Sequence, residues 1–439
     1  MIDATHDPAL VSWVESANDP AIDFPIQNLP FGVFGIAAGD GARTGVAIGD
    51  RVLDLGEAHR LGLFDGESQR AASLCGDSLN DLMALGATAW THLRRRLSEM
   101  LRADTALGAR AAKHASSILV SQRDLVMQLP ARIGNYSDFY ASIAHATNVG
   151  SMMRPDNPLL PNYKWVPIGY HGRASSIVIS GTPVKRPRGQ TKADDSAAPR
   201  FAPSARLDYE LEVGLFIGPG NRRGAPIPIA EAGAHLFGLC LLNDWSARDI
   251  QAWEYQPLGP FLSKSFATSI SPWIVTTDAL SPFRAPALAR PAADPQPLPH
   301  LSDASDAAQG AFDIGLDVNL QSRAMRELGL APQRLSRASF AAMYWTPAQL
   351  IAHHASNGCN MLPGDVLGSG TVSGEAKDAR GCLLELTWRG SEPVALASGE
   401  TRRFLEDGDI VTLSGSCERP GYRRIGFGEC SGEVIAAVA

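Results

Sequence analysis

Two glutamates that lie two positions apart, Glu210 and Glu212, are the first residues in the sequence that could do chemistry. They belong to the run LDYELEVGLFIG, residues 207–218, in which apolar side chains alternate with acidic ones at the start. This period of two predicts a strand with both glutamates on one face, opposite the face that packs. Because neighbouring carboxylates repel each other, a cation between them is favoured, and oxygen ligands suit Mg²⁺ or Ca²⁺. The alternative is a solvated acidic face.

A second group of polar side chains follows an apolar stretch in the segment at 241–266. Asp244, Arg248, Gln251 and Tyr255 are spaced at i, i+4, i+7 and i+11. On a helix this spacing places an acid, a guanidinium, an amide and a phenol in one narrow stripe. Such a stripe packs poorly but suits the wall of a polar pocket. An exposed polar helix face is the alternative.

A third segment, NYSDFYASIAHATNVG at 135–150, contains an acid and a histidine seven positions apart. If one helix begins after Ser137 as its N-cap, Asp138 and His145 share a face. The acid could then orient the histidine, or it could bind a metal beside a histidine that acts as a base. The residues alone do not decide between these, and a single histidine is most often structural.

Two later motifs offer further polar groups. Glu385 lies in the apolar run CLLELTW, which predicts a strand in which the glutamate is buried and needs a partner such as a histidine. Thr371 lies in the glycine-rich loop GSGTVSG, where backbone amides can approach a ligand closely. The adjacent His353 and His354 point about 100° apart on a helix, so they are interpreted as structural residues.

The elements that must position these residues fall into two predicted domains with an α+β, β-rich fold. Residues 1–130 predict a small domain, and residues 131–439 carry all the candidate chemistry. In the first domain we expect strands within 26–37 and 44–56, a tight turn at Gly49–Asp50, and helical structure over 79–103. In the second we expect strands at 175–180, 207–217, 383–388, 409–415 and 424–435, and proline-rich surface loops at 186–206 and 281–300.

Composition excludes several classes of function. The formal net charge of −7 disfavours nucleic-acid binding. No apolar run approaches the length of a membrane span, and the N-terminus lacks the pattern of a signal peptide. The six cysteines form no short pair, so we expect buried thiols in a reducing compartment and a cytoplasmic protein.

Several long strings resemble the fumarylacetoacetate hydrolase family over essentially the whole chain. They are DFYASIAHATNVG (138–150), VPIGYHGRASSIVISGTP (166–183), DYELEVGLFIGPGNR (208–222), NDWSARDIQAWEYQPLGPFLSKSF (243–266) and GSGTVSG (368–374). The resemblance implies a small N-terminal SH3-like barrel, a larger C-terminal mixed β-roll and a homodimer. It also implies a divalent cation, Mg²⁺ or Ca²⁺, and no organic cofactor.

The resemblance also implies roles for individual residues. The cation ligands would be Asp138, Glu210, Glu212 and Asp244, with Lys264 and Thr268 also counted at the cation sites, Thr268 beside a second, structural ion. The general base would be His145, oriented by Glu385, and the oxyanion would meet Arg248, Gln251 and Lys264. Substrate contacts would come from Tyr140, Arg154, Gln251, Tyr255 and Thr371. One departure is Ala267, where the family pattern has glycine, which bears on the outer cation site.

The activity implied is metal-dependent hydrolysis of the carbon–carbon bond of 4-fumarylacetoacetate to fumarate and acetoacetate, the last step of tyrosine and phenylalanine (homogentisate) degradation. A cation on the diketone oxygens would stabilise the expelled carbanion. The alternative on the same fold is an acylpyruvate hydrolase, an oxaloacetate-type decarboxylase or a hydratase. A protein that binds a metal and a diacid without turnover is a further alternative of a different class.

Overall fold

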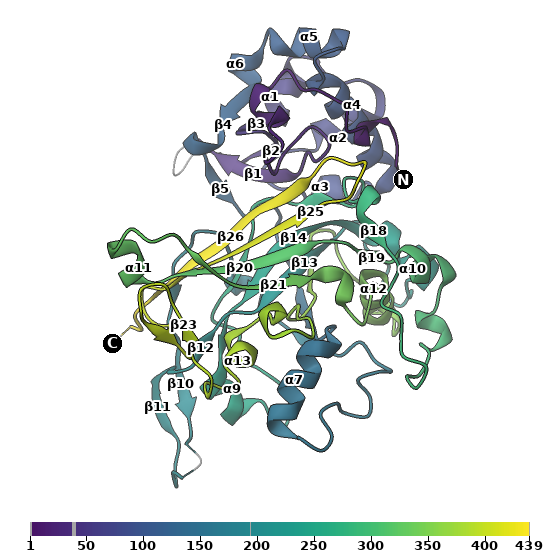
Figure 1. Cartoon of the computed structure of the whole chain (residues 1–439). Helices are drawn as coiled ribbons and strands as arrows, with labels where there is room; N and C mark the ends of the chain where they lie inside the picture. The colour runs from purple at the N-terminus through teal and green to yellow at the C-terminus, as the bar shows by residue number, and fades with distance from the viewer. Residues whose placement is uncertain (1, 37–40, 194, 439) are drawn as a thin grey trace.

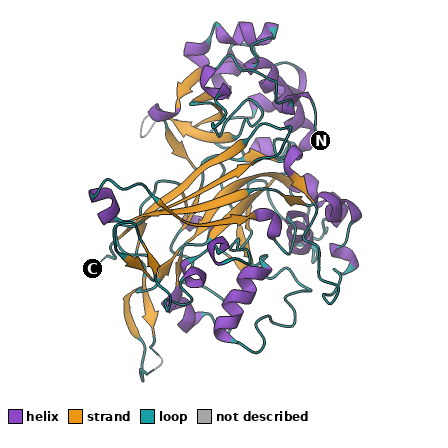
Figure 2. Cartoon of the chain, in the orientation of Figure 1, coloured by secondary structure: helices purple, strands orange, loops and turns teal. Residues whose placement is uncertain are grey.

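The computed structural model describes residues 2–36, 41–193 and 195–438, which form a small N-terminal unit and a larger unit built on two β-sheets (Figure 1). In Figure 1 the N-terminal unit, coloured purple to blue, lies above the long strands of the larger unit. Figure 2 shows helices gathered at the outer end of the N-terminal unit and again beneath the large sheets. The fold is β-rich and contains both helices and strands, as the sequence predicts.

The N-terminal unit contains a five-stranded antiparallel sheet in the order β4-β3-β2-β1-β5. Its strands are β1 (Phe31–Gly35), β2 (Arg43–Ile48), β3 (Arg51–Asp54), β4 (Leu119–Ser121) and β5 (Val126–Gln128). The predicted turn at Gly49–Asp50 is confirmed, because Ile48 pairs with Arg51 and Gly49 has a φ of +58°. The SH3-like barrel is not confirmed, since β4 and β5 are the edges of an open sheet. Ala37, at the end of the predicted strand 26–37, lies outside the described residues.

Helices pack against this sheet. They are α1 (Leu55–Arg60), α2 (Gly66–Ser73), α3 (Asn80–Met83), α4 (Ala87–Leu101), α5 (Ala106–Ala112) and α6 (Ala115–Ile118). The helix predicted over 79–103 is therefore two helices, and the break occurs where Gly86 adopts a φ of +84°. The longer one, α4, buries Trp90, Leu93 and Leu97 in the core of this unit.

The central sheet of the larger unit has the order β7-β6-β22-β13-β14-β16-β8, with β17 also paired to β14. These strands are β6 (Tyr136–Phe139), β7 (Gly169–His171), β8 (Ile177–Ile179), β13 (Leu211–Ile217), β14 (Leu236–Asp244), β16 (Thr268–Ile270), β17 (Val275–Thr276) and β22 (Val366–Gly368). Every residue of β13 and β14 is buried, because both faces of these strands are covered. The alternative of a solvated acidic face on 207–217 is therefore wrong.

A second sheet packs on the central one. Its order is β21-β20-β25-β26-β9, with β9 (Val184–Lys185), β20 (Gly315–Gln321), β21 (Gln333–Ser339), β25 (Ile410–Cys417) and β26 (Ile425–Ile435). Glycines permit the close approach of the two sheets. A Cβ added at Gly415 would lie 3.0 Å from Leu241, and one added at Gly432 would lie 2.7 Å from Trp245.

The remaining elements are short and connect or cover the sheets. The strands are β10 (Arg188–Thr191), β11 (Arg200–Pro203), β12 (Leu207–Asp208), β15 (Ser246–Ala247), β18 (Arg284–Ala285), β19 (Ala311–Phe312), β23 (Val394–Ala395) and β24 (Thr401–Arg402). The helices are α7 (Ile143–Met153), α8 (Ile229–Ala232), α9 (Arg248–Glu254), α10 (Ala304–Gln309), α11 (Arg323–Glu327), α12 (Pro347–Ala355) and α13 (Leu383–Leu386). Figure 1 shows α7, α9 and α13 together beneath the sheets.

Most of the predicted strands of the larger unit are confirmed, and one is wrong. The strands predicted at 175–180, 409–415 and 424–435 correspond to β8, β25 and β26. The strand predicted at 383–388 is instead the short helix α13, because an apolar run of this length is compatible with either structure once it is buried. The loop predicted at 186–206 contains the hairpin β10–β11, and residue 194 within it lies outside the described residues.

The expected burial is found for most of the cysteines. All six cysteines are free thiols; four are buried, Cys75 is half-buried and Cys359 is exposed, so the expectation of burial is wrong for Cys359. Across the described ranges, none of the helices combines the length and the apolar character needed to cross a bilayer.

The packing of the two sheets gives a prediction about stability. Gly432→Ala should lower the free energy of unfolding by about 1–3 kcal/mol, because the new methyl group would overlap the Trp245 ring. Gly76→Ala is the matched control, since a Cβ there meets nothing within 4 Å. Chemical denaturation of both variants measures the effect. An equal stability of the two variants would contradict the tight contact between the sheets.

Candidate active site

Four acidic side chains meet at one end of the central sheet. Asp138 lies in β6, Glu212 in β13 and Asp244 at the end of β14, while Glu210 directly precedes β13. One oxygen from each carboxylate lies within 4.8 Å of the others, and each residue is at most 5% exposed. The structure thus brings together the four residues that the family resemblance implies as cation ligands, which are named the acidic cluster below.

Glycines at the end of β22 allow the carboxylates to come this close. Gly368 pairs with Asp138 across the parallel β6 and with Gly214 across the antiparallel β13. A Cβ at Gly368 would lie 2.4 Å from Asp138 Oδ1 and 3.0 Å from Glu212 Oε2. The N–H of Gly370 donates to the same two oxygens, at 3.2 and 3.0 Å. The glycine-rich loop therefore provides both the space for the two carboxylates and a backbone N–H that donates to them.

Burial and mutual repulsion perturb the ionisation of the acidic cluster. Burial, reinforced by the charge of Asp244, raises the pKa of Asp138 to about 7. The pKa of Glu212 is raised well above its ordinary value, first by burial and then by Asp138 and Asp244. For Glu210 burial acts in the same direction, but attraction to Lys264 and Arg248 outweighs it and holds the pKa at about 2. If all four carboxylates were ionised, the acidic cluster would therefore carry more negative charge than its protein neighbours offset.

A divalent cation fits this group of donors. The Glu212 Oε1 atom is buried and has no hydrogen-bond partner within the described part of the chain. Lys264 Nζ contacts both Glu210 and Asp244, the latter at 2.8 Å, and offsets a single charge. Carboxylate oxygens at this density are the ligands that Mg²⁺ and Ca²⁺ prefer.

The other two residues predicted at cation sites contact the acidic cluster from outside. Although burial opposes it, Asp244 and Glu210 raise the pKa of Lys264, so its ammonium has no lone pair to offer and acts as a counter-charge. Thr268 pairs with Asp244 across β14 and β16, and its hydroxyl donates to Asp244 Oδ1 at 3.0 Å. Ala267, which precedes it, is buried.

A buried histidine–glutamate pair lies beside the acidic cluster. His145 is in α7, whose N-cap Ser142 accepts from the His145 N–H, and its Nδ1 lies 2.6 Å from Glu385 Oε2. Burial tends to raise the pKa of Glu385, but His145, Asn148 and Ser373 outweigh burial and lower it to about 2. With Nδ1 donating to an ionised carboxylate, the Nε2 atom of His145 keeps its lone pair for a proton acceptor role.

Asp138 and His145 lie in different elements, so the prediction that one helix carries both is wrong. Residues 136–139 form β6, and the helix begins only at Ile143, so Asp138 and His145 do not share a helix face. Asp138 belongs to the acidic cluster, whereas His145 belongs to the pair with Glu385. The acid does not orient the histidine; Glu385, from a distant segment, does.

The stripe predicted from Asp244 to Tyr255 is also divided between two elements. Asp244 ends β14, and α9 begins at Arg248, so only the last three residues of the stripe are at helical spacing. Arg248 Nη1 lies 2.7 Å from Glu210 Oε1 and donates to Gln251 Oε1 at 3.1 Å. The Nη2 atom of Arg248 is buried and has no partner among the described residues. The guanidinium thus links α9 to the acidic cluster and keeps one donor free.

The predicted substrate contacts divide into inner and outer residues. Tyr140 packs edge-on against the His145 ring, with ring centroids 5.3 Å apart, and Thr371 is buried one residue after Gly370. Arg154 is exposed at the end of α7 and donates to the carbonyl of Pro158. Tyr255 caps the end of α9, and its hydroxyl accepts from Gln256. Tyr140 and Thr371 are thus next to the site, whereas Arg154 and Tyr255 contact neither the acidic cluster nor the histidine–glutamate pair in the described structure.

Sequence reasoning missed several residues that contact the site. Tyr170 donates to Asp244 Oδ2 at 3.0 Å. Three further groups donate to Glu385: Asn148 at 2.8 Å, Ser373 at 2.8 Å and Cys382 at 3.2 Å. Of these, Asn148 had a signal in the sequence, because it follows His145 by three positions and so shares its helix face. The interpretation of His354 as structural agrees with its contact to Ser137 at 2.9 Å.

Comparison with known proteins places this site in a family. The family model for the fumarylacetoacetate (FAA) hydrolase C-terminal region matches residues 135–435, and the model for the fumarylacetoacetase N-terminal region matches residues 27–130. The chain belongs to the fumarylacetoacetate hydrolase family. The fumarylacetoacetase of Caenorhabditis elegans is 50% identical to it over 94% of this chain and 97% of the relative. That of Homo sapiens is 47% identical over 98% of this chain and 99% of the relative.

A solved structure of a protein from Mycobacterium smegmatis described as HpcE shares the fold. It matches with a TM-score of 0.50 and 20% identity, covering 92% of this chain and 99% of that chain. This similarity concerns the arrangement of elements alone. Membership of the fumarylacetoacetate hydrolase family therefore rests on the two family models and on relatives that are 47% and 50% identical over nearly the whole chain.

The charge imbalance gives a prediction about pH and cation binding. Because the pKa of Asp138 is raised to about 7 from an unfolded value of about 3.9, the folded chain binds protons more tightly than the unfolded chain. Without a cation, this group therefore lowers stability progressively as pH rises from about 4 through about 7. Glu212 acts in the same direction. A divalent cation should take the place of the protons on Asp138 and Glu212 and so prevent the loss of stability at higher pH.

The measurement is the unfolding midpoint with Mg²⁺ and with EDTA, from about pH 5 to about pH 8. The gap between the two conditions should widen as pH rises, because protons compete with the cation less and less. A gap that stays constant over this range would contradict binding of the cation at the acidic cluster.

Proposed function

We propose that this chain hydrolyses the carbon–carbon bond of 4-fumarylacetoacetate to give fumarate and acetoacetate. The observation that carries the proposal is a buried acidic cluster beside a buried histidine–glutamate pair, with Arg248 adjoining the cluster, in a chain about half identical to fumarylacetoacetases over nearly its whole length. The reaction is the last step of tyrosine and phenylalanine degradation.

The acidic cluster would hold a divalent cation, for which Mg²⁺ and Ca²⁺ are the candidates. When bound there, the cation supplies Lewis-acid stabilisation of negative charge on the diketone oxygens of the substrate. Asp138, Glu210, Glu212 and Asp244 would be its ligands. Lys264 limits the net charge that the site must carry before the cation binds.

The base would be His145. Its Nε2 atom takes a proton from a water molecule, while Glu385 keeps the Nδ1 proton in place and stabilises the imidazolium that forms. The resulting hydroxide adds to the carbonyl carbon next to the fumaroyl arm. The carbon–carbon bond then breaks, the acetoacetate carbanion leaves, and a proton returns to that carbon.

The oxyanion that forms on the attacked carbonyl would be met by Arg248, Gln251 and Lys264. Arg248 Nη2 is suited to this role because it is buried with no partner in the described structure. One such donor typically contributes on the order of 3 kcal/mol to stabilisation of the transition state. Tyr140 and Thr371 would contact the substrate close to the reacting bond, and Arg154 and the two tyrosines, Tyr140 and Tyr255, would hold its carboxylate ends.

Four further features belong to the same proposal. The family resemblance supports a homodimer. The free cysteines support a cytoplasmic location. The ranges of the two family models support a domain boundary near residues 130 and 131. The contact of Thr268 with Asp244 supports a second cation site outside the acidic cluster.

The experiment that tests the reaction is product identification. Purified protein is incubated with 4-fumarylacetoacetate, with an acylpyruvate and with oxaloacetate, and the products are resolved by NMR. Fumarate and acetoacetate in a one-to-one ratio, formed much faster than any product from the other two substrates, is the expected result. Preference for the acylpyruvate or for oxaloacetate would move the function to the alternative hydrolase or decarboxylase.

Glu385→Gln should lower kcat by about 100-fold or more with little change in KM, because the amide no longer fixes the tautomer of His145. Glu392→Gln is the matched control, since Glu392 is an exposed glutamate paired with Lys377. An unchanged kcat for Glu385→Gln would remove the glutamate from this role.

His145→Ala should abolish turnover while cation affinity, measured by calorimetry, is retained.

A further inference from the structure

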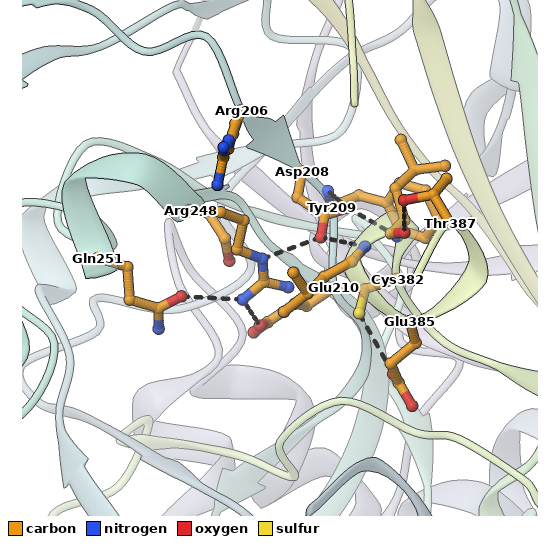
Figure 3. Close-up of polar contacts among 12 residues, drawn as sticks. Arg206, Asp208, Tyr209, Glu210, Arg248, Gln251, Cys382, Glu385 and Thr387 are labelled. Carbon is orange, nitrogen blue, oxygen red and sulfur yellow. Dashed lines mark hydrogen bonds and ion pairs between the residues drawn. The ribbon is translucent and has the colours of Figure 1, made fainter. Parts of the chain in front are cut away.

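Asp208 is a fully buried carboxylate that accepts four hydrogen bonds from three separate segments of the chain (Figure 3). Its Oδ1 accepts from the backbone N–H groups of Tyr209 at 2.9 Å and Leu383 at 2.8 Å. Its Oδ2 accepts from the backbone N–H of Leu384 at 2.9 Å and from Arg248 Nε at 2.9 Å. It lies outside the group of carboxylates that could bind the cation.

One side of this arrangement fixes the arginine. Asp208 binds Nε of Arg248, while Glu210 and Gln251 bind Nη1, so the plane of the guanidinium is set by contacts on two of its nitrogens. The third nitrogen, Nη2, stays buried and without a partner in the described structure. Since Glu210 is also a candidate cation ligand, Asp208 is the carboxylate that remains committed to the arginine when the cation binds.

The other side fixes the helix that carries Glu385. The N-cap of α13 is Cys382, whose side chain makes no capping hydrogen bond to the helix. The first two helical N–H groups, those of Leu383 and Leu384, donate to Asp208 instead. A helix of four residues is not stable by itself, so its orientation depends on such tertiary contacts. Glu385 is the next residue in this turn.

We propose that Asp208 is a positioning residue that sets the orientation of Arg248 relative to the Glu385–His145 pair. It does not touch the reacting atoms in this account. The single carboxylate of Asp208 binds both Arg248, the oxyanion donor, and the turn that carries Glu385. These two groups therefore keep a fixed position relative to each other. The proposal rests on the proposed function, because it assigns these two groups to the same reaction.

A second buried aspartate gives the comparison that separates positioning from simple stability. Asp409 is equally buried and binds Arg402 through Nε at 2.8 Å and Nη2 at 3.0 Å. It also accepts from the backbone N–H of Glu406 at 2.9 Å. None of these partners is a candidate site residue. Asp409→Asn therefore removes a similar buried charge pair without disturbing the arginine or α13.

Asp208→Asn is the test variant, because the amide has the same shape but replaces one acceptor oxygen with a donor NH₂ group. That group must face either the N–H groups of Tyr209 and Leu383 or those of Leu384 and Arg248, so one contact to α13 is lost in either orientation. We expect kcat for fumarylacetoacetate to fall about 10- to 100-fold, with KM and the affinity for Mg²⁺ changed less than threefold. Asp409→Asn should keep kcat within about threefold of the unmodified chain.

Coupling to Glu385 supplies a second readout. If Asp208 acts through the histidine–glutamate pair, Asp208→Asn should lower kcat by a much smaller factor in the Glu385→Gln background than in the unmodified chain. Amide hydrogen exchange followed by mass spectrometry supplies a third readout that needs no substrate. Peptides covering residues 382–387 should exchange faster in Asp208→Asn and not in Asp409→Asn. If Asp208→Asn does not fold, Asp208→Ser, which leaves space for water, takes its place in all three measurements.

Three results would overturn the proposal: a kcat loss no larger than that of Asp409→Asn, full additivity with Glu385→Gln, or unchanged exchange in α13. Failure of the proposed function is recognised separately, because the unmodified chain would then release no fumarate. In that case the exchange of residues 382–387 alone decides whether Asp208 holds α13.

Discussion

The site depends on one electrostatic constraint: four carboxylates share a volume from which the protein has excluded water. Burial raises the pKa of Asp138 and of Glu212, which means that the ionised cluster costs free energy until a counter-charge is supplied. Lys264 and Arg248 supply part of it, and both bind Glu210. The remainder is the charge that a divalent cation would bring. Glycine at the end of β22 lets the neighbouring strands bring their carboxylates close together, although the carboxylates repel one another.

The acidic cluster and the histidine–glutamate pair form one connected unit. Glu210 contacts Arg248, Arg248 contacts Asp208, and Asp208 caps the turn that carries Glu385. Figure 3 shows Arg248 between Glu210 and Asp208, the contacts of Asp208 with the backbone of α13, and the contact of Cys382 with Glu385. The groups that would bind the cation and the groups that would activate water are therefore linked by side chains that are nearly all buried. Water is kept from these contacts, which strengthens each of them.

The family resemblance named residues that the structure brings close together, whereas local patterns assigned several of these residues to the wrong elements. The alternation around Glu210 and Glu212 predicted a strand over 207–217, and β13 confirms it from Leu211 onward, because a period of two is a local property of the chain. The break at Tyr209 and Glu210, which separates β12 from β13, was not predicted. The spacing from Asp244 to Arg248 also fits a helix, yet Asp244 ends β14, since sheet pairing overrides local periodicity. Glu385 was expected in a strand but lies in α13, whose cap comes from a residue about 175 positions away. Long-range contacts of this kind leave no periodic signal, so Asp208 and Tyr170 were not identified as parts of the site.

The most direct test of the account is the dependence of turnover on a divalent cation. The protein is treated with EDTA and dialysed, and loss of the enol absorbance of 4-fumarylacetoacetate is followed before and after addition of Mg²⁺ or Ca²⁺. The account predicts little decay in the stripped protein and recovery of activity on addition of the cation, with no recovery in Glu212→Gln at the same cation concentration. Full activity of the stripped protein, or equal recovery in Glu212→Gln, would contradict a cation held by the acidic cluster.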